Sequence, residues 1–172
     1  HPWPNKKTQW YYDVASIPVL GRLFTETLTL PVGRLSIDGA SSTVFCPNPV
    51  PDNYTAKAQI PLVLRPSAFH ANAQDVAGLH AYVTAASKRY GEINKPVVII
   101  TGDEDSVVAE EIHAKGIERD IAGSELVWIK GIGHKPDYVA AEIAVAAIEK
   151  INGMPRDLQA AARDLEAVLA AS

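Results

Sequence analysis

The sequence has little cysteine, no long apolar run and no concentration of positive charge. Its one cysteine, Cys46, excludes an internal disulfide framework and a metal site built from several cysteines, and it fits a reducing compartment such as the cytoplasm. The longest clean apolar run, residues 96–100, is far shorter than the ~20 residues that a membrane span requires. The charges are dispersed and sum to -4, so we expect neither a nucleic-acid partner nor a membrane span.

An initiating methionine and a recognisable signal peptide are also missing. The sequence begins at His1, so we expect that preceding polypeptide, together with any targeting segment, is absent from it. Its 172 residues are nevertheless enough for one domain of ordinary size.

The first half of the chain has the periodicity of helices and no clear strand. Apolar residues recur at helical spacing over residues 17–28, and a second helix is expected within 31–45. Prolines and turn-forming residues predict a loop over 46–53, and another helical pattern follows within 67–90. We therefore predict an all-helical segment over residues 1–90.

The second half alternates between strand and helix patterns. Residues 96–101 form a continuous β-branched run, which is typical of a strand covered on both faces in a mostly parallel sheet. A helix is expected over 106–121, a second strand over 125–130, and helices over 136–151 and 158–169. This alternation predicts a doubly wound α/β unit.

The first predicted strand requires more neighbours than this chain can provide. Burying the four side chains of residues 97–100 contributes very roughly 6 to 12 kcal/mol, comparable with the net stability of a typical domain. The sequence contains one other strand pattern, and an uncovered strand edge invites aggregation. We expect the missing strands to belong to an N-terminal half, either in a longer precursor or in a companion polypeptide.

Two short polar motifs follow the two predicted strands. They are Thr101-Gly-Asp-Glu-Asp105 and Gly131-Ile-Gly-His134. Open α/β sheets place their active sites at the C-terminal ends of strands, so both motifs are candidates for chemistry. A histidine can take a proton from a hydroxyl and return it to a leaving group, and a carboxylate can hold that histidine in the required tautomer.

Together with the proline before the first strand and the helix between them, these motifs closely resemble the last third of an α/β-hydrolase. The segments His1-Pro-Trp-Pro4, Trp10-Tyr-Tyr12, Leu20-Gly21, Leu30-Pro-Val-Gly33 and Pro49-Val-Pro51 are similar to the start of the cap in bacterial members of that family. The resemblance covers nearly the whole chain. It implies the C-terminal portion of an α/β-hydrolase fold, a doubly wound, mostly parallel sheet with an all-helical cap.

The resemblance also implies a division of the chain and a role for each motif. It makes residues 1–90 a helical cap, 91–152 the C-terminal part of the hydrolase core, and 153–172 an extra C-terminal helix. Asp105 becomes the acid of a catalytic triad and His134 its base. The chain departs from the commoner Gly-His-x-Pro-x-x-Glu pattern after the histidine, although the proline is retained.

The serine of the triad has no counterpart in this sequence. The family order places the nucleophile before the acid and the histidine, but no serine here lies in Gly-x-Ser-x-Gly. By the resemblance, we expect the N-terminal half or companion polypeptide to supply that motif. The completed enzyme would hydrolyse small apolar esters without a cofactor.

Three alternatives remain open. An aspartate nucleophile in the same fold would open carbon–halogen or epoxide bonds. The chain could instead be a noncatalytic cap and sheet subunit that completes a partner chain. A nucleotide-binding module is a weaker interpretation, because the sequence has neither a strand-linked Gly-x-Gly-x-x-Gly nor a phosphate loop.

Other residues have simpler explanations than catalysis. Asp103 and Glu104 compete with Asp105 for the acid role, but we expect both to be solvated turn carboxylates or helix caps. A charged, exposed helix face explains His113. No pair of histidines has the spacing of a zinc site, so we predict no metal.

Three aromatic residues are candidates for the wall of an apolar substrate pocket. They are Trp10, Phe24 and Phe45. Packing within the helical cap explains them as well.

Overall fold

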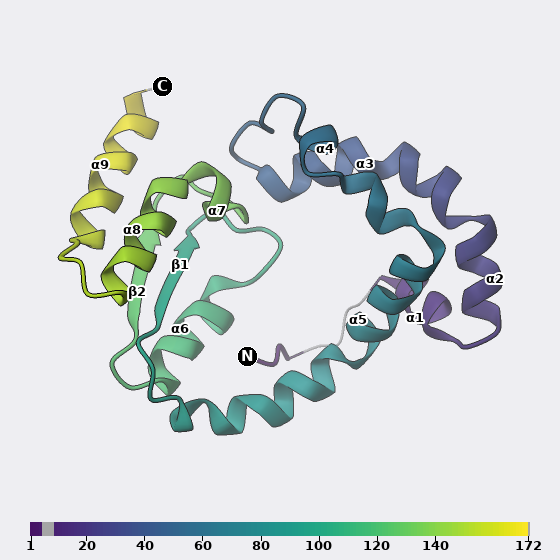
Figure 1. The fold of residues 1–172 in the computed structure, drawn as a ribbon, viewed down its shortest axis with the longest axis horizontal. Helices are drawn as coiled ribbons and strands as arrows, with labels where there is room; N and C mark the ends of the chain where they lie inside the picture. The colour runs from purple at the N-terminus through teal and green to yellow at the C-terminus, as the bar shows by residue number, and fades with distance from the viewer. Residues whose placement is uncertain (5–8, 172) are drawn as a thin grey trace. The chain divides into compact units, whose positions relative to one another are not determined.

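The computed structural model describes residues 1–4 and 9–171, and the chain divides into two compact units (Figure 1). The helical unit consists of Pro2–Ser41 and Val50–Ala86. The sheet unit consists of His1, Ser42–Pro49 and Ser87–Ser172. None of the described helices is both long enough and apolar enough to cross a membrane.

Every element of the described helical unit is helical, as predicted. These elements are α1 (Trp10–Ser16), α2 (Leu20–Thr27), most of α3 (Thr29–Phe45), α4 (Tyr54–Lys57), the 3₁₀ helix η1 (Ile60–Leu64) and α5 (Pro66–Ala86). The long helix α5 packs against α1 and α2. Tyr12 stacks on Phe69 with ring centroids 5.9 Å apart, and the His70 ring nitrogen Nδ1 lies 2.7 Å from the Ala15 carbonyl oxygen.

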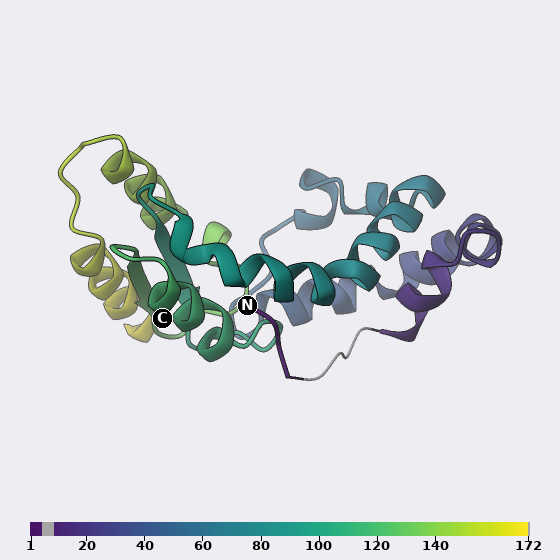
Figure 2. The same ribbon diagram turned by 90° about the horizontal axis from the view of Figure 1, so that it is seen from below.

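The sheet unit contains two parallel strands with helices on both faces (Figures 1 and 2). Its elements are the 3₁₀ helix η2 (Ser87–Glu92), β1 (Val98–Gly102), α6 (Glu110–Asp120), β2 (Glu125–Ile129), α7 (Pro136–Val139), α8 (Ala141–Ile151) and α9 (Leu158–Ala171). Residues Val98 to Gly102 pair in register with Glu125 to Ile129. Both predicted strands are therefore present: β1 begins two residues later and ends one residue later than predicted, and β2 ends one residue earlier.

Two helix predictions were wrong in detail. The helix expected from residue 106 begins at Glu110, because the Asp105 carboxylate accepts the backbone N–H groups of Val107 and Val108 and holds residues 106–109 as a loop. The helix expected over 136–151 is interrupted at Ala140, whose φ of -119° and ψ of 38° are not helical.

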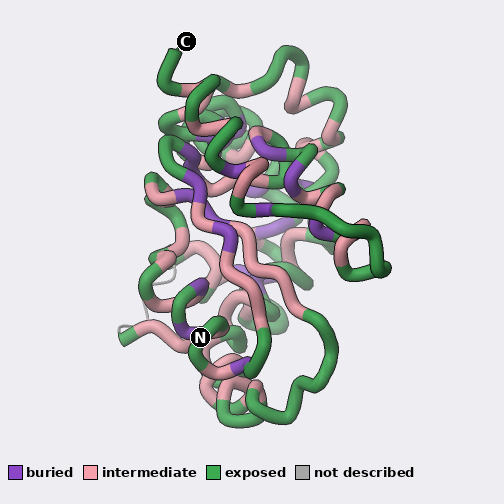
Figure 3. The backbone as a smooth tube through the Cα atoms, turned by 90° about the vertical axis from the view of Figure 1, so that its left-hand side faces the viewer, coloured by how far each residue is buried: buried purple, intermediate pink, exposed green. Residues whose placement is uncertain are grey.

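The main hydrophobic core lies between the sheet and the pair α8 and α9. Val127 and Ile129 of β2 are fully buried there, against Ile143 of α8 and Leu158 of α9. Adjacent residues of a strand point to opposite faces, and Trp128 accordingly lies beneath the ammonium group of Lys115 from α6, 4.9 Å from the ring centroid. Figure 3 shows the buried segments of the backbone in purple.

Side chains of α9 satisfy the outer edge of β2. Gln159 donates from Nε2 to the Leu126 carbonyl over 3.0 Å, and the Lys130 N–H donates to the Glu166 carboxylate over 2.9 Å. The C-terminal helix thus packs on the core and also provides partners for the backbone at this edge.

The free edge of the sheet belongs to β1. The Val97 carbonyl accepts from Glu125, and the Asp103 N–H donates to Ile129. Alternate residues of a parallel strand bond to the same neighbour, so the backbone groups of Val98 and Ile100 are directed toward the opposite edge. Residues 97–100 are half-buried.

The compact units differ from the predicted division at residues 90 and 152. Ser42–Pro49 joins the sheet unit, because Phe45 is fully buried with its ring against Tyr138 of α7. The last helix packs into the core of the same unit. In the helical unit, Val19 is 83% exposed and Leu35 is 89% exposed.

Candidate active site

A glycine at the end of β1 lets the loop that carries His134 approach the strand. This loop, residues 130–135, is called the histidine loop below. A Cβ added to Gly102 would lie 1.9 Å from the carbonyl oxygen of Ile132, which no side chain could tolerate. The Glu104 N–H donates to that same carbonyl over 3.0 Å. The segment after β1 and the loop after β2 are therefore in direct contact, as expected for the C-terminal ends of two parallel neighbours.

Asp105 is held by three hydrogen bonds. Its Oδ1 accepts from the backbone N–H groups of Val107 and Val108, each over 2.8 Å, and its Oδ2 lies 2.9 Å from Nδ1 of His134. The Asp105 side chain is 10% exposed. Burial raises its pKa, but the Val108 N–H, the His134 ring and the Val107 N–H outweigh burial, so the pKa of Asp105 lies below its ordinary value.

The geometry determines the tautomer of His134. An ionised carboxylate only accepts hydrogen bonds, so the hydrogen of the neutral ring lies on Nδ1 and Nε2 keeps its lone pair. Nε2 makes no hydrogen bond to the residues that the structure describes, and the side chain is 33% exposed. The ring can therefore accept a proton at Nε2 while Asp105 stabilises the resulting imidazolium.

Two side chains bind the backbone of the histidine loop. Asp103 Oδ1 accepts the Gly131 N–H over 2.7 Å. Asn48 donates from Nδ2 to the Gly131 carbonyl over 2.8 Å and accepts the Gly133 N–H at Oδ1 over 3.1 Å. Asp103 lies in a turn, as predicted, and its carboxylate also joins the two motifs, which was not predicted.

Sequence reasoning missed Asn48 altogether. It lies in the proline-rich stretch that was predicted only to be loop, and no motif marks it. Its partner Gly131 is 83 residues away in the chain.

The predicted aromatic pocket residues have different environments. In the helical unit, Trp10 is 66% exposed and its ring meets Phe24 edge to face, with centroids 6.2 Å apart. In the sheet unit, Phe45 is fully buried. A role in substrate binding remains a prediction for all three.

The other histidines lie outside the dyad of Asp105 and His134. His80 contacts the Trp3 carbonyl through Nε2 over 3.0 Å, within the helical unit. His113 of α6 was predicted to be exposed, but it is half-buried. Burial lowers the pKa of His113, and the Asp105 carboxylate acts to raise it. Among the described residues, no group of three or more His, Cys, Asp or Glu side chains could hold a metal ion.

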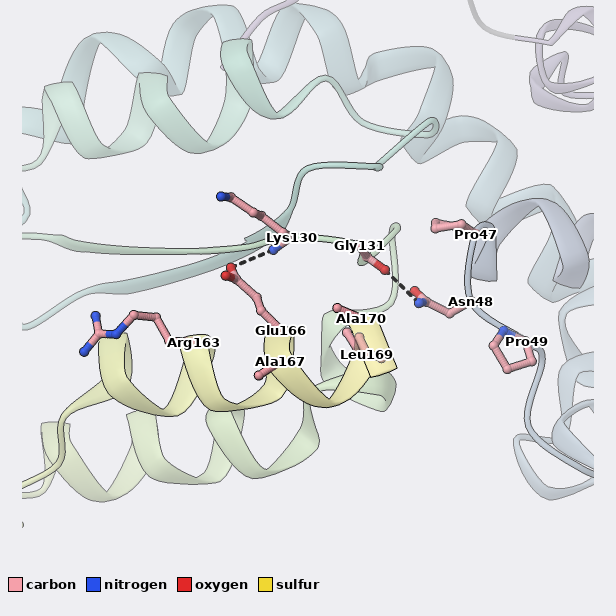
Figure 4. Close-up of a pocket in the computed structure, with 10 residues that line it drawn as sticks. All are labelled: Pro47, Asn48, Pro49, Lys130, Gly131, Arg163, Glu166, Ala167, Leu169 and Ala170. Atoms are coloured by element: carbon pink, nitrogen blue, oxygen red, sulfur yellow. Dashed lines mark hydrogen bonds between the residues drawn. The ribbon is translucent and has the colours of Figure 1, made fainter. Parts of the chain in front are cut away.

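A pocket of about 650 Å³ lies beside the histidine loop in the sheet unit (Figure 4). Its walls are the Pro47–Pro49 turn, Lys130 with Gly131, and α9. Neither Asp105 nor His134 lines it, so it is separate from the dyad. Figure 4 shows Asn48 reaching from this wall to Gly131, and Glu166 reaching to the backbone of Lys130.

Comparisons with known proteins identify the fold. No protein-family model matches the sequence, and no curated protein matches it. Among solved structures, the chain is similar to MGS-M2, an α/β-hydrolase enzyme from a Medee basin deep-sea metagenome library, with a TM-score of 0.51 and 18% sequence identity. The match covers 87% of this chain and 53% of that chain, so this chain spans about half the length of MGS-M2.

At this identity the likeness concerns the fold alone. The two parallel strands, the helices on both faces and the all-helical segment correspond to part of MGS-M2. The chain has the fold of part of an α/β-hydrolase with a helical cap.

Proposed function

We propose that this chain supplies the acid and the base of a hydrolase triad that cleaves small apolar carboxylic esters. The observation that carries the proposal is the contact of His134 Nδ1 with Asp105 Oδ2 over 2.9 Å, at the C-terminal ends of adjacent parallel strands. The nucleophile, most simply a serine in Gly-x-Ser-x-Gly, would come from polypeptide outside these 172 residues.

In this proposal His134 acts twice in each cycle. Nε2 first takes the proton of the serine hydroxyl as the oxygen attacks the acyl carbon, and then gives it to the departing alcohol. Water repeats the sequence to release the acid. Asp105 keeps the hydrogen on Nδ1 and stabilises the imidazolium, while the N–H groups of Val107 and Val108 keep Asp105 ionised and fixed.

Several features support completion by more polypeptide. The backbone of Val98 and Ile100 faces an edge that can accept another parallel strand, whereas α9 covers the edge of β2. Large apolar side chains such as Val19 and Leu35 are exposed on the helical unit. The solved structure of similar fold is nearly twice as long as the matched region.

The test is intact mass spectrometry of the native assembly, with and without a fluorophosphonate that labels activated serines. We expect the mass of the assembly to include a second polypeptide or a longer chain. The probe should label the unmodified protein and the control variant His70→Gln, but not His134→Gln. His70 is a matched control because it is a part-buried histidine of the helical unit. Labelling that survives His134→Gln would overturn the assignment of the base.

The identity of the nucleophile has its own readout. An assembly that resists the fluorophosphonate but hydrolyses a haloalkane or an epoxide, with dependence on His134, indicates an aspartate nucleophile. That result retains the dyad and replaces the ester substrate.

A second candidate is a noncatalytic subunit that completes a partner chain. The absence of Gly-x-Ser-x-Gly from this sequence favours it. It requires an assembly in which no probe or substrate reacts and in which His134→Gln leaves association unchanged.

A further inference from the structure

Asn48 makes two hydrogen bonds to the backbone that carries His134. Its Nδ2 donates to the Gly131 carbonyl over 2.8 Å, and its Oδ1 accepts the Gly133 N–H over 3.1 Å. These groups lie three residues and one residue before His134. Figure 4 shows the first of the two bonds.

An amide side chain can fulfil both tasks, because it carries a donor and an acceptor. A carboxylate accepts but cannot donate to the Gly131 carbonyl, and an aliphatic side chain does neither. The residue type is therefore matched to one donor and one acceptor of the loop.

The segment before Asn48 is itself tied to the histidine loop and to α7. A Cβ on Gly133 would lie 2.0 Å from the Cys46 carbonyl oxygen, so the two backbones are in contact. Phe45 is fully buried with its ring edge to face against Tyr138, at 5.7 Å between centroids. Asn48 consequently bonds the loop from an anchored backbone and not from a free turn.

We propose that Asn48 is a positioning residue for His134, which sets the backbone of the loop so that Nδ1 meets Asp105. The proposal deepens the function proposed above and rests on it for its catalytic meaning. Asp103 accepts the Gly131 N–H, so both backbone polar groups of Gly131 have side-chain partners. Loss of the Asn48 bonds leaves the Gly131 carbonyl without its side-chain partner.

The experiment compares Asn48→Asp, Asn48→Leu and the control Asn152→Asp in the full chain. Asn152 is an exposed asparagine that donates to the Ile148 carbonyl at the end of α8, so its variant makes the same chemical change away from the loop. Nuclear magnetic resonance measures amide hydrogen exchange at Gly131 and Gly133 and the tautomer of His134 from its ring nitrogen shifts.

We expect a graded result. In Asn48→Leu, exchange of the Gly133 amide accelerates about fivefold to tenfold, in line with the loss of one hydrogen bond. In Asn48→Asp, which keeps the acceptor, Gly133 stays protected. In both variants the His134 population with hydrogen on Nδ1 falls, and in Asn152→Asp nothing changes.

Unchanged tautomer populations in both Asn48 variants would overturn the positioning role, even if the variants were less stable. Should Asn48→Leu fail to fold, Asn48→Asp alone decides. In the completed enzyme, kcat for p-nitrophenyl acetate falls by about tenfold to a hundredfold with KM unchanged.

These readouts separate the two proposals. If the His134 tautomer population changes in the Asn48 variants but fluorophosphonate labelling persists in His134→Gln, Asn48 keeps its role in the loop and the triad is refuted. If the tautomer population stays the same in the Asn48 variants but labelling is lost in His134→Gln, the triad is retained and the role of Asn48 is refuted.

Discussion

Replacing Gly133 by alanine tests the contact between the histidine loop and the segment of Phe45 to Asn48. The new Cβ would lie 2.0 Å from the Cys46 carbonyl oxygen and 3.4 Å from the Phe45 carbonyl oxygen. Both are backbone atoms, so relief requires a shift of main chain and not the turn of a flexible side chain. That shift also breaks the bond from the Gly133 N–H to Asn48.

The magnitude follows from two costs. Overpacking in a tight site costs about 1 to 3 kcal/mol, and loss of one hydrogen bond costs about 1 kcal/mol. We therefore expect Gly133→Ala to lower the free energy of unfolding by about 2 to 4 kcal/mol. This is a large part of the 5 to 15 kcal/mol that stabilises a typical domain.

Two other glycines of the sheet unit provide controls. A Cβ on Gly91 makes an ordinary contact, 3.7 Å from the Asp120 carbonyl oxygen, so Gly91→Ala should change stability by less than about 0.5 kcal/mol. Gly131 has open space around it but a φ of 74°, so Gly131→Ala should cost roughly 1 to 2 kcal/mol through strain alone.

The assay is urea unfolding followed by tryptophan fluorescence, with the slopes of the transitions compared between variants. The expected order of stability is Gly91→Ala, then Gly131→Ala, then Gly133→Ala. If Gly133→Ala unfolds at the same urea concentration as Gly91→Ala, the loop does not lie on Cys46, and Asn48 does not bond the loop from an anchored backbone.

Three further predictions concern the core, the acid and the last helix. Leu158→Ala should cost about 2 to 5 kcal/mol in urea unfolding, because Leu158 is 1% exposed in the main core. Because the pKa of Asp105 is lowered in the folded state, its ionised form adds stability above the unfolded pKa of about 4. This contribution is lost as pH falls through the folded pKa. The melting temperature between about pH 3 and 6 should therefore depend less on pH in Asp105→Asn than in the unmodified chain. A chain ending at Gly153 lacks α9 and exposes the outer edge of β2 in addition to the edge of β1, so sedimentation velocity should detect more self-association than in the full chain.

Much of the sheet unit was predictable because its signals are local. A run of β-branched residues indicated β1, and a second apolar stretch of strand length indicated β2. Parallel neighbours end at the same edge, so the motifs that follow them were expected to meet, and His134 lies 2.9 Å from Asp105. The start of α6 was misplaced, since periodicity does not reveal that Asp105 occupies the amides of Val107 and Val108.

The support of the dyad was not predictable from the same signals, for a physical reason. Asn48 and Gly131 are 83 residues apart, and an asparagine among prolines is ordinary loop chemistry until the fold brings it to its partner. Asp105 and His134 are marked in the sequence by their chemical type and by the strand ends that precede them, whereas Asn48 is marked only by contacts between distant segments. A candidate pair can therefore be named from motifs in a sequence, but which side chains bond the loop beside that pair becomes apparent only once the chain is folded.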